Sequence, residues 1–383
     1  MAPLFYFPLL RPSEPFSVPS LYPRIRAPFF VGFDSPGLGR KVGGMDRTLK
    51  QMGEDGMLAL LGPVLRRHTA ALPLGTGDDV AITGAPASGE RLVWTIDAMV
   101  EGTHFRFWEA SPGAEWVGRK LAASNLSDLA SKGATPLYAL VSFGAPGGTS
   151  ESRIREFYDG LERELAEAGA RLIGGDTVRA PQWTLSLTLV GALPAGLPIA
   201  ARSRARPGSS LYVTGHPGRA GAGFLLLDGL PAALRVGRED LIRAHARPKA
   251  RLAEGRAIIE DFPDAAMLDV SDGIGRDAAR LCERSGVGIV LEEALLPVSE
   301  DVGEVACAAG KSGLELTLFG GEDYELLFAT EAPEDRVRAA FVQRGIVTPV
   351  TRIGCVVEGN NLTIRSRDGT QRAITPQGFE HFA

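Results

Sequence analysis

The sequence predicts a protein of two domains, each of the α/β or α+β class. Apolar strand-like runs alternate with helical patterns in both halves of the chain. A segment rich in proline, glycine, alanine and arginine, residues 194–210, separates the two halves. The 383 residues are enough to form two hydrophobic cores of ordinary domain size.

The first 44 residues differ from the rest of the chain. Prolines recur there among aromatic residues, and proline at this density prevents a continuous helix. The first basic residue, Arg11, follows the apolar stretch, whereas a signal peptide has the opposite order. We therefore expect a disordered extension over 1–44, with Met45 as the functional start. The predicted domains are 45–193 and 211–383, joined by a linker over 194–210.

In the first half, a strand over 92–97 precedes a helix over 113–131. One face of this helix is formed by residues at spacings of four, four and three. These residues are Val117, Leu121, Asn125 and Asp128. Asp128 is thus expected to point inward, where a carboxylate needs a cation partner. The other elements predicted in this half are a strand over 137–143, a helix over 151–168, and strands over 171–175 and 183–193.

The second half shows the same alternation of apolar runs and helical periodicity. A helix is expected to open at Gly273, directly after a strand that ends at residue 270. The predicted strands are 211–215, 266–270, 287–291, 324–330 and 347–354. The other predicted helices are 219–228, 239–246, 249–260 and 333–344.

Composition excludes several classes of function. The net charge of −5 offers no general attraction to nucleic acid or to an anionic membrane surface. No apolar run approaches the roughly 20 residues of a membrane helix. The three cysteines form no C-x-x-C pair, which favours reduced thiols in a cytoplasmic protein over a disulfide framework or a zinc site.

Acidic residues stand at the ends of apolar runs and in glycine turns, rather than on solvated helix faces. Carboxylates placed in this way are what a protein needs to hold hard cations against phosphate groups. The segments are GTGDDVAI (75–82), TIDAMVEGTHF (95–105), NLSDLASKGATP (125–136), IGGDTVRAP (173–181), DVSDGIGRDA (269–278) and GGEDYELLF (320–328).

The common nucleotide-binding motifs are missing. The nearest approach to a phosphate-binding lysine loop is AAGKS (308–312), but Val305 stands where its first glycine is required. In GTGDDV, Val80 occupies the third glycine position of a dinucleotide-binding motif. No H-R-D or D-F-G element of a protein kinase occurs either. Metal ions are therefore expected to replace the lysine loop.

Each acidic segment also has a simpler interpretation. Asp78 and Asp79 suit an ordinary turn, and Gly174-Gly175-Asp176 suits a type II turn. Ser271 or Asp272 suits a helix cap, although capping explains only one of the two acids in DVSD. An isolated histidine such as His104 is more often structural. Because acidic residues recur in the same kind of setting in six segments, we favour the interpretation that they bind metal ions and phosphate.

Taken in order, these motifs resemble the thiamine-monophosphate kinase family over nearly all of 45–383. The resemblance rests on GDD, ID followed by GTHF, NLSDLA, GGDT, DVSDG, GGEDYEL and the closing GFEHF. It implies the two-domain fold of the aminoimidazole-ribonucleotide synthetase superfamily, with a homodimer formed through the N-terminal sheet. It also implies ATP-dependent phosphorylation of thiamine monophosphate to thiamine diphosphate, by direct in-line transfer assisted by several Mg²⁺ ions.

The resemblance assigns roles to individual residues of this sequence. The implied magnesium ligands are Asp79, Thr95, Asp97, Asp128, Asp176, Asp269 and Asp272. The implied ATP contacts are Gly175, Asp176, Arg202, Ser271 and Tyr158. Thiamine phosphate would be contacted by His104, Glu322 and Phe379, and the catalytic role would fall to Asp176 and Asp272.

Two positions depart from the family pattern. Ile96 stands where a hydroxyl residue is frequent, so that any metal contact there must come from the backbone. Pro376 replaces an aromatic residue, which leaves Phe379 as the stacking ring expected against the cationic thiazolium. No general base is expected, because the acceptor is already an ionised phosphate.

Two other hypotheses remain at this point. Another ATP-dependent synthetase of the superfamily would need a reactive N-terminal Cys–Lys element or a C-terminal cysteine tail, and the sequence has neither. A non-catalytic sensor of thiamine phosphate or nucleotide would have no need of so many acids.

Overall fold

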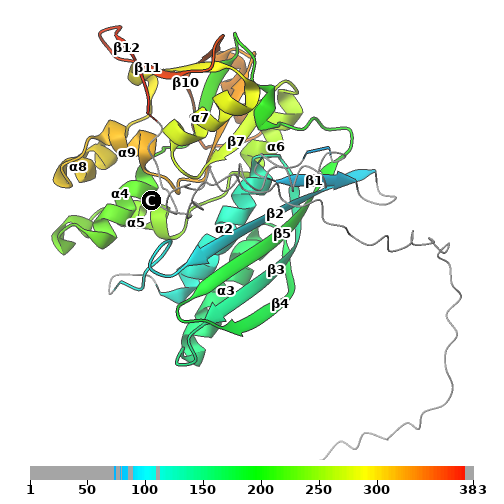
Figure 1. Ribbon diagram of the computed structural model, residues 1–383, viewed down its shortest axis with the longest axis vertical. Helices are drawn as coiled ribbons and strands as arrows, with labels where there is room; N and C mark the ends of the chain where they lie inside the picture. The colour runs from blue at the N-terminus through cyan, green and yellow to red at the C-terminus, as the bar shows by residue number, and fades with distance from the viewer. Residues whose placement is uncertain (1–72, 75–77, 79, 85–88, 109–112, 376–383) are drawn as a thin grey trace, which may run out of the picture. The chain divides into compact units, whose positions relative to one another are not determined.

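The computed structural model describes residues 73–74, 78, 80–84, 89–108 and 113–375. The chain divides into two compact units, Met1–Thr48 and Leu49–Ala383, and all described residues belong to the second. Two sheets organise this unit, one of five strands and one of seven (Figure 1).

The five-stranded sheet has the order β1-β2-β5-β3-β4. All its pairs are antiparallel except that of β3 with β4, which is parallel. Alternate residues of β2 are buried and exposed, as expected for a sheet with one covered face. The strands are β1 (Ala81–Gly84), β2 (Glu90–Val100), β3 (Thr135–Ala145), β4 (Arg171–Arg179) and β5 (Thr184–Pro194).

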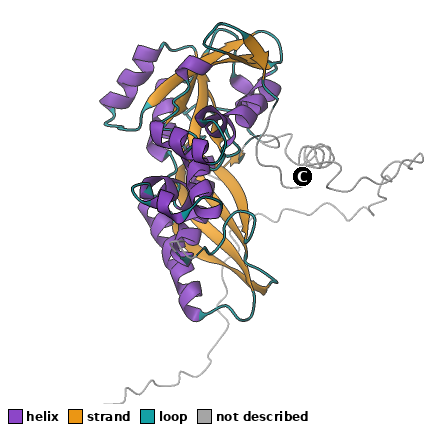
Figure 2. Ribbon diagram, turned by 90° about the vertical axis from the view of Figure 1, so that its left-hand side faces the viewer, coloured by secondary structure: helices purple, strands orange, loops and turns teal. Residues whose placement is uncertain are grey.

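Two long helices, α2 (Ala114–Ala130) and α3 (Glu151–Glu167), cover one face of this sheet (Figure 2). They pack very closely, because a Cβ atom on Gly118 would lie 2.1 Å from the Phe157 carbonyl oxygen. One on Gly160 would lie 1.9 Å from the carbonyl oxygen of Glu115. Nearly every residue of α2 is buried. Helix α2 therefore occupies the interior, between the first sheet and elements of the second half.

The opposite face of the five-stranded sheet is apolar and exposed. No helix within the described ranges covers it (Figure 2). The large exposed apolar side chains on its strands are Trp94, Ile96, Tyr138, Leu140, Ile173 and Val178.

The seven-stranded sheet has the order β12-β11-β8-β10-β6-β9-β7 and is mixed, because β11 pairs with β8 in parallel. Its strands β7 and β9 are buried along their whole length. The strands are β6 (Ser210–Thr214), β7 (Ala266–Val270), β8 (Gly288–Glu292), β9 (Glu325–Thr330), β10 (Val350–Val357), β11 (Leu362–Arg365) and β12 (Gln371–Ala373).

Helices of the second half pack around this sheet. A core that contains Leu268 and Ile289 lies on one face of it, while Tyr212 and Phe328 on the other face join the core of the first sheet. The helices are α4 (Arg219–Asp228), α5 (Glu239–Ala246), α6 (Leu252–Asp261), α7 (Ile274–Ser285), α8 (Glu300–Ala308), α9 (Gly313–Phe319) and α10 (Glu334–Gln343). Short 3₁₀ turns are η1 (Arg202–Arg204), η2 (Ala232–Arg235) and η3 (Glu293–Leu295).

The predicted α/β architecture is confirmed, and most element boundaries agree within three residues. The prediction missed β1, α8, α9, β11 and β12, which are short elements with weak periodicity. The strand predicted over 171–175 is too short, because β4 continues to Arg179. The linker at 194–210, which contains η1, and the other domain boundaries remain predictions. None of the described helices has the length and apolarity that crossing a membrane requires.

Candidate functional site

The first part of the site lies between β2 and α2. The Thr95 hydroxyl donates to the Asp128 carboxylate, and the Asp97 backbone N–H donates to Asn125 Oδ1 at 3.1 Å. Thr95 and Asp97 are two residues apart on β2, so both side chains point to the face that α2 covers. Asp128 thus points inward, as the helical spacing predicts. Asp97 lies within β2 rather than at the end of a strand, which corrects the sequence interpretation.

Ile96 belongs to the other face of β2. Its side chain is 66% exposed and points away from Thr95 and Asp97. The side chain at this position therefore belongs to the open face of the sheet and does not lie among the side chains beside α2.

Strand β7 brings a second acid to α2. The Ser127 hydroxyl donates to Asp269 Oδ2 at 2.7 Å, and both residues are almost completely buried. Residues 127 and 128 are neighbours on α2, so this helix contacts polar side chains of both sheets. The site therefore combines side chains from the two halves of the chain.

The turn from β7 into α7 is held by an acid that the sequence interpretation did not single out. Asp277 Oδ2 accepts the backbone N–H groups of Ser271 and Asp272, each at 3.1 Å. The N-cap residue of α7 is Gly273, without a side-chain cap. The capping interpretation of Ser271 and Asp272 is therefore wrong. Asp272 is ion-paired instead, with Arg280 Nη2 2.6 Å from its Oδ2.

The four acids Asp97, Asp128, Asp269 and Asp272, which we call the carboxylate cluster, interact electrostatically. Burial, followed by repulsion from Asp97 and Asp269, raises the pKa of Asp128 well above its usual value. Burial raises the pKa of Asp97 too, and Asp272 adds to this increase. The pKa of Asp269 rises to about 6, mainly through burial. The cluster thus concentrates negative charge in an environment that opposes it.

This donor chemistry fits a hard divalent cation. Crowded carboxylate and hydroxyl oxygens are the ligands that Mg²⁺ prefers, and bound positive charge would relieve their mutual repulsion. Within the described ranges, no three His, Cys, Asp or Glu side chains are already gathered around one metal position. Asp79 lies outside the described residues. The cluster therefore provides suitable donors that are not yet arranged as a closed coordination shell.

Arg202 lies beside the cluster, in η1. Burial lowers its pKa, while the charges of Asp78 and Asp269 oppose this decrease. The Arg202 backbone N–H donates to Asp78 Oδ2 at 3.0 Å, and Asp78 Oδ1 lies 2.8 Å from Lys132 Nζ. Asp78 is thus part of an interior ion pair, whereas residues 75–77 and 79 of the same segment lie outside the described residues.

Gly175, Asp176 and Tyr158 lie at the β4 edge of the first sheet, but not on one face of it. Gly175 and Asp176 lie within β4, so the type II turn interpretation is wrong. The Thr177 side chain hydrogen-bonds Tyr158 of α3, so the neighbouring Asp176 points to the open face. Strand β4 is three strand spacings, about 14 Å, from β2. The structure therefore does not bring these residues to the carboxylate cluster of the same chain.

The predicted substrate contacts His104 and Glu322 are linked by a residue not predicted from the sequence. Lys120 Nζ donates to the His104 carbonyl oxygen at 3.0 Å and lies 2.7 Å from Glu322 Oε1. His245 Nδ1 lies 3.3 Å from Glu322 Oε2. The His104 imidazole accepts the Val100 backbone N–H through Nδ1. Phe379, the third predicted contact, and Pro376 lie outside the described residues.

The loop that carries Glu322 has unusual backbone geometry. Glu322 and Tyr324 both have positive φ values, 58° and 51°. Asp323, between them, accepts the backbone N–H groups of Gly218 and Ala220, which open α4. Burial nevertheless raises the pKa of Asp323 to about 7. Burial and then the charge of Glu322 raise the pKa of Tyr324, to which Asp97, Asp269 and Asp128 also contribute. The loop therefore reaches the carboxylate cluster.

Sequence reasoning missed Lys120, His245, Asp277 and Arg280. A signal existed for Lys120, because Lys120, Ser124 and Ser127 continue the inward helical face at spacings of four and three. For His245 and Asp277 no local pattern indicates the partner, since Glu322 lies far along the chain and Asp277 binds backbone groups. The assignments of individual site residues remain predictions.

Comparisons with known proteins agree with this arrangement. The family model described as AIR synthase related protein, N-terminal domain, matches residues 77–193, and the corresponding C-terminal model matches residues 206–367. The thiamine-monophosphate kinase of Bacillus subtilis is 33% identical over 319 residues, which cover 82% of this chain and 95% of that protein. The Mycobacterium tuberculosis (strain H37Rv) enzyme of the same name is 36% identical over 292 residues, 75% of this chain and 83% of that protein.

Solved structures of related proteins also match the fold of this chain. AaThiL complexed with AMPPCP and TMP superposes with a TM-score of 0.74 at 30% identity, covering 88% of this chain and 100% of that chain. The hydrogenase maturation protein HypE superposes with a TM-score of 0.61 at 18% identity, covering 76% of this chain and 90% of that chain, and shares the fold alone.

Proposed function

The chain belongs to the thiamine-monophosphate kinase family, and from this premise we propose that it transfers the γ-phosphoryl group of ATP to thiamine monophosphate. The products are thiamine diphosphate and ADP. The observation that carries the proposal is the carboxylate cluster at the junction of β2, α2 and β7. Support for ATP and thiamine phosphate as substrates comes from the AaThiL complex with AMPPCP and TMP.

The proposed transfer is direct and in line, with Mg²⁺ as the cofactor. The residues that would hold Mg²⁺ are Thr95, Asp97, Asp128, Asp269 and Asp272, together with Asp79. When bound, Mg²⁺ supplies the positive charge that lets two phosphate groups approach each other. The protein itself contributes position: Thr95 orients Asp128, Ser127 orients Asp269, and Asp277 fixes the backbone of Ser271 and Asp272.

Arginine side chains supply fixed positive charge beside the cluster. Arg280 contacts both Asp272 and Asp277, and Arg202 lies within electrostatic reach of Asp269. A cation held by Asp272 would share that carboxylate with Arg280. We place the ATP phosphates here because guanidinium groups suit phosphate oxygens. No side chain needs to remove a proton, since the acceptor phosphate is already ionised.

The first test is a product assay. Purified protein with ATP, MgCl₂ and thiamine monophosphate is expected to form thiamine diphosphate and ADP in equal amounts, measured by chromatography. Thiamine and an aminoimidazole precursor serve as control acceptors and are expected to give no product. Release of free phosphate without thiamine diphosphate would rule out the proposed function.

We further propose that the protein acts as a homodimer through the open face of the five-stranded sheet. The exposed apolar side chains Trp94 and Ile96 of β2 and Tyr138 and Leu140 of β3 lie on the same face, on either side of β5, and exposed apolar surfaces usually mark an interface. Asp176 points to the same face. Its proposed role at the nucleotide would then be completed by a second copy, which accounts for its distance from the carboxylate cluster within one chain.

Replacing Ile96 by glutamate is expected to dissociate this dimer. Two buried glutamates per dimer would cost about 3 kcal/mol or more, which raises the dissociation constant about a hundredfold or more. Sedimentation velocity over a concentration series measures the change. Val347→Glu is the matched control, because Val347 is 95% exposed in the loop before β10. A wild-type monomer, or an Ile96→Glu variant that associates like wild type, would refute this interface.

A further inference from the structure

The Glu322 carboxylate is clamped between two helices. Lys120 of α2 lies 2.7 Å from its Oε1, and His245 of α5 lies 3.3 Å from its Oε2. The side chains of Lys120 and His245 are only 3% and 4% exposed, whereas that of Glu322 is 29% exposed. Glu322 is therefore held from the protein interior while part of it remains accessible.

The clamp is not needed to hold the loop backbone. The Glu322 N–H donates to the Ser271 carbonyl oxygen at 2.6 Å, and the Tyr324 N–H donates to that of Val270 at 2.9 Å. The Asp323 carboxylate attaches the loop to the first turn of α4. These contacts fix the main chain, so the contacts of Lys120 and His245 act on the direction of the Glu322 side chain.

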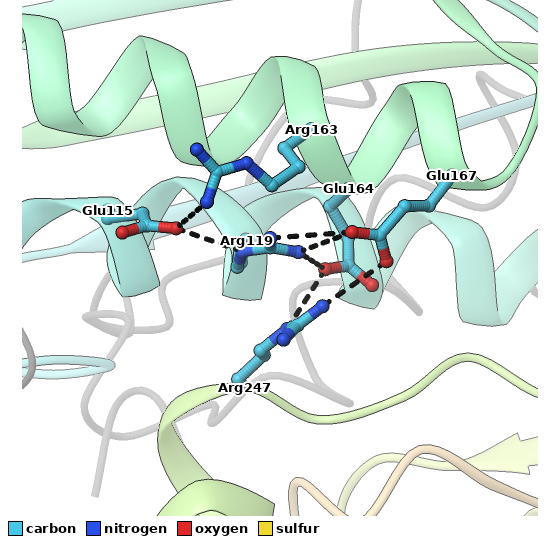
Figure 3. Close-up of polar contacts among 6 residues, drawn as sticks. All are labelled: Glu115, Arg119, Arg163, Glu164, Glu167 and Arg247. Carbon is cyan, nitrogen blue, oxygen red and sulfur yellow. Dashed lines mark hydrogen bonds and ion pairs between the residues drawn. The ribbon is translucent and has the colours of Figure 1, made fainter.

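A second layer of ion pairs joins the helix that carries Lys120 to the chain that follows His245, through two acids of α3 (Figure 3). Arg119, next to Lys120, lies 2.6 Å from Glu164 of α3. Arg247, two residues after His245, contacts Glu164 at 3.3 Å and Glu167 at 3.2 Å. The same two acids of α3 thus bind the helix that carries Lys120 and the end of the helix that carries His245.

Charge at Glu322 depends on this clamp. Burial alone would raise its pKa, but the Lys120 ammonium and then His245 outweigh burial and hold the pKa of Glu322 well below its usual range. Burial and Lys120 lower the pKa of His245, so its imidazole is neutral near pH 7. Glu322 also interacts with the ionisable groups of Asp323 and Tyr324 in its own loop, and Asp228 interacts with His245. A fixed, ionised carboxylate is what recognises a cation.

We infer that Lys120 and His245 are positioning residues that aim the Glu322 carboxylate at the cationic thiazolium ring of thiamine monophosphate. The inference rests on the proposed function and deepens it. Lys120 also binds the carbonyl oxygen of His104, so that one ammonium links both predicted substrate contacts. The clamp thereby selects a cationic acceptor over a neutral one of the same shape.

The test compares KM for thiamine monophosphate, KM for ATP and kcat in four variants. Lys120→Met removes the charge, and Lys120→Arg keeps it. His245→Leu removes the polar contact, and His245→Asn retains a nitrogen near the position of Nδ1. Arg163→Met is the matched control, because Arg163 pairs with Glu115 in the same ion-pair network and is 55% exposed.

Lys120→Met is expected to raise the pKa of Glu322. KM for thiamine monophosphate should then rise about tenfold near pH 6 and return to within about threefold of wild type near pH 9. The sign follows because Glu322 becomes protonated as the pH falls through its raised pKa. KM for ATP should stay within about twofold, since the clamp does not touch the nucleotide. Lys120→Arg and His245→Asn should recover most of the loss.

A neutral substrate analogue sharpens the test. With carbon in place of the thiazolium nitrogen, wild type should show a higher KM than for thiamine monophosphate, and Lys120→Met should reduce that difference near pH 6. If Lys120→Met and His245→Leu keep the wild-type KM and pH profile, the inference is overturned but the proposed function is not. The same holds if KM rises equally for thiamine monophosphate and for the neutral analogue at every pH. A wild-type protein that forms no thiamine diphosphate would overturn the proposed function and this inference together.

Discussion

Replacing Asp128 by asparagine is expected to lower kcat about a thousandfold and to leave the folded protein at least as stable as wild type. The two effects have one cause. Burial and the charges of Asp97 and Asp269 already raise the pKa of Asp128, so its ionised form is unfavourable in the absence of a cation. The neutral amide removes that repulsion and with it a ligand for positive charge at the transferred phosphate.

Activity and thermal unfolding should be measured on the same preparations, with and without MgCl₂. Magnesium is expected to raise the Tm of wild type and to have little effect on Asp128→Asn. Asp159→Asn, at an exposed position of α3, is the control and should match wild type in both measurements. An Asp128→Asn variant with wild-type kcat would exclude the cluster as the site. A large loss of stability would make Asp128 a structural residue.

Replacing Arg251 by methionine is expected to lower the free energy of unfolding by about 3–5 kcal/mol. Arg251 binds the almost completely buried Glu325 through two contacts of 2.6 Å, Nε to Oε2 and Nη2 to Oε1. The Thr214 hydroxyl donates to the same carboxylate at 2.7 Å. Removing the guanidinium leaves an uncompensated charge in the interior beside β6 and β9.

Urea denaturation at fixed protein concentration measures this change. The double variant Arg251→Met, Glu325→Gln should recover part of the loss, because the stranded charge is then absent. Arg338→Met breaks an exposed pair with Glu334 in α10 and should change stability by less than about 0.5 kcal/mol. If Arg251→Met changes the free energy of unfolding as little as Arg338→Met does, the Glu325 carboxylate must become solvated or protonated when its partner is removed.

Local periodicity was sufficient for much of the fold. The helical spacing predicts that Asp128 points inward, which its contact with Thr95 confirms, and the alternation of strands and helices predicts α/β or α+β architecture in both halves. Elements without a long periodic pattern, such as α9 and β12, could not be found in this way. The sequence interpretation places a strand end at Asp97 because the charge interrupts the apolar run, yet pairing with β5 extends β2 to Val100.

Long-range pairing decides what the sequence could not predict about the site. Asp176 follows two glycines, which favours a turn beside a ligand, but its register opposite Ser142 directs its side chain to the open face. Lys120 and Glu322 meet only because α2 packs beneath the loop before β9. Asp277 acts through backbone groups, and no spacing rule distinguishes it from a solvated helical acid.

The positive φ of Glu322 has a consequence for how this protein can be improved. A glutamate in the left-handed region costs about 1 kcal/mol that glycine would not cost. Glu322→Gly would relieve this strain, but it would also leave the Lys120 ammonium, whose side chain is 3% exposed, without its carboxylate. Losing the partner of a buried charge costs more than the strain, so the single variant is expected to be less stable than wild type. A screen for heat resistance is therefore expected to return glycine at position 322 only together with a neutral residue at position 120.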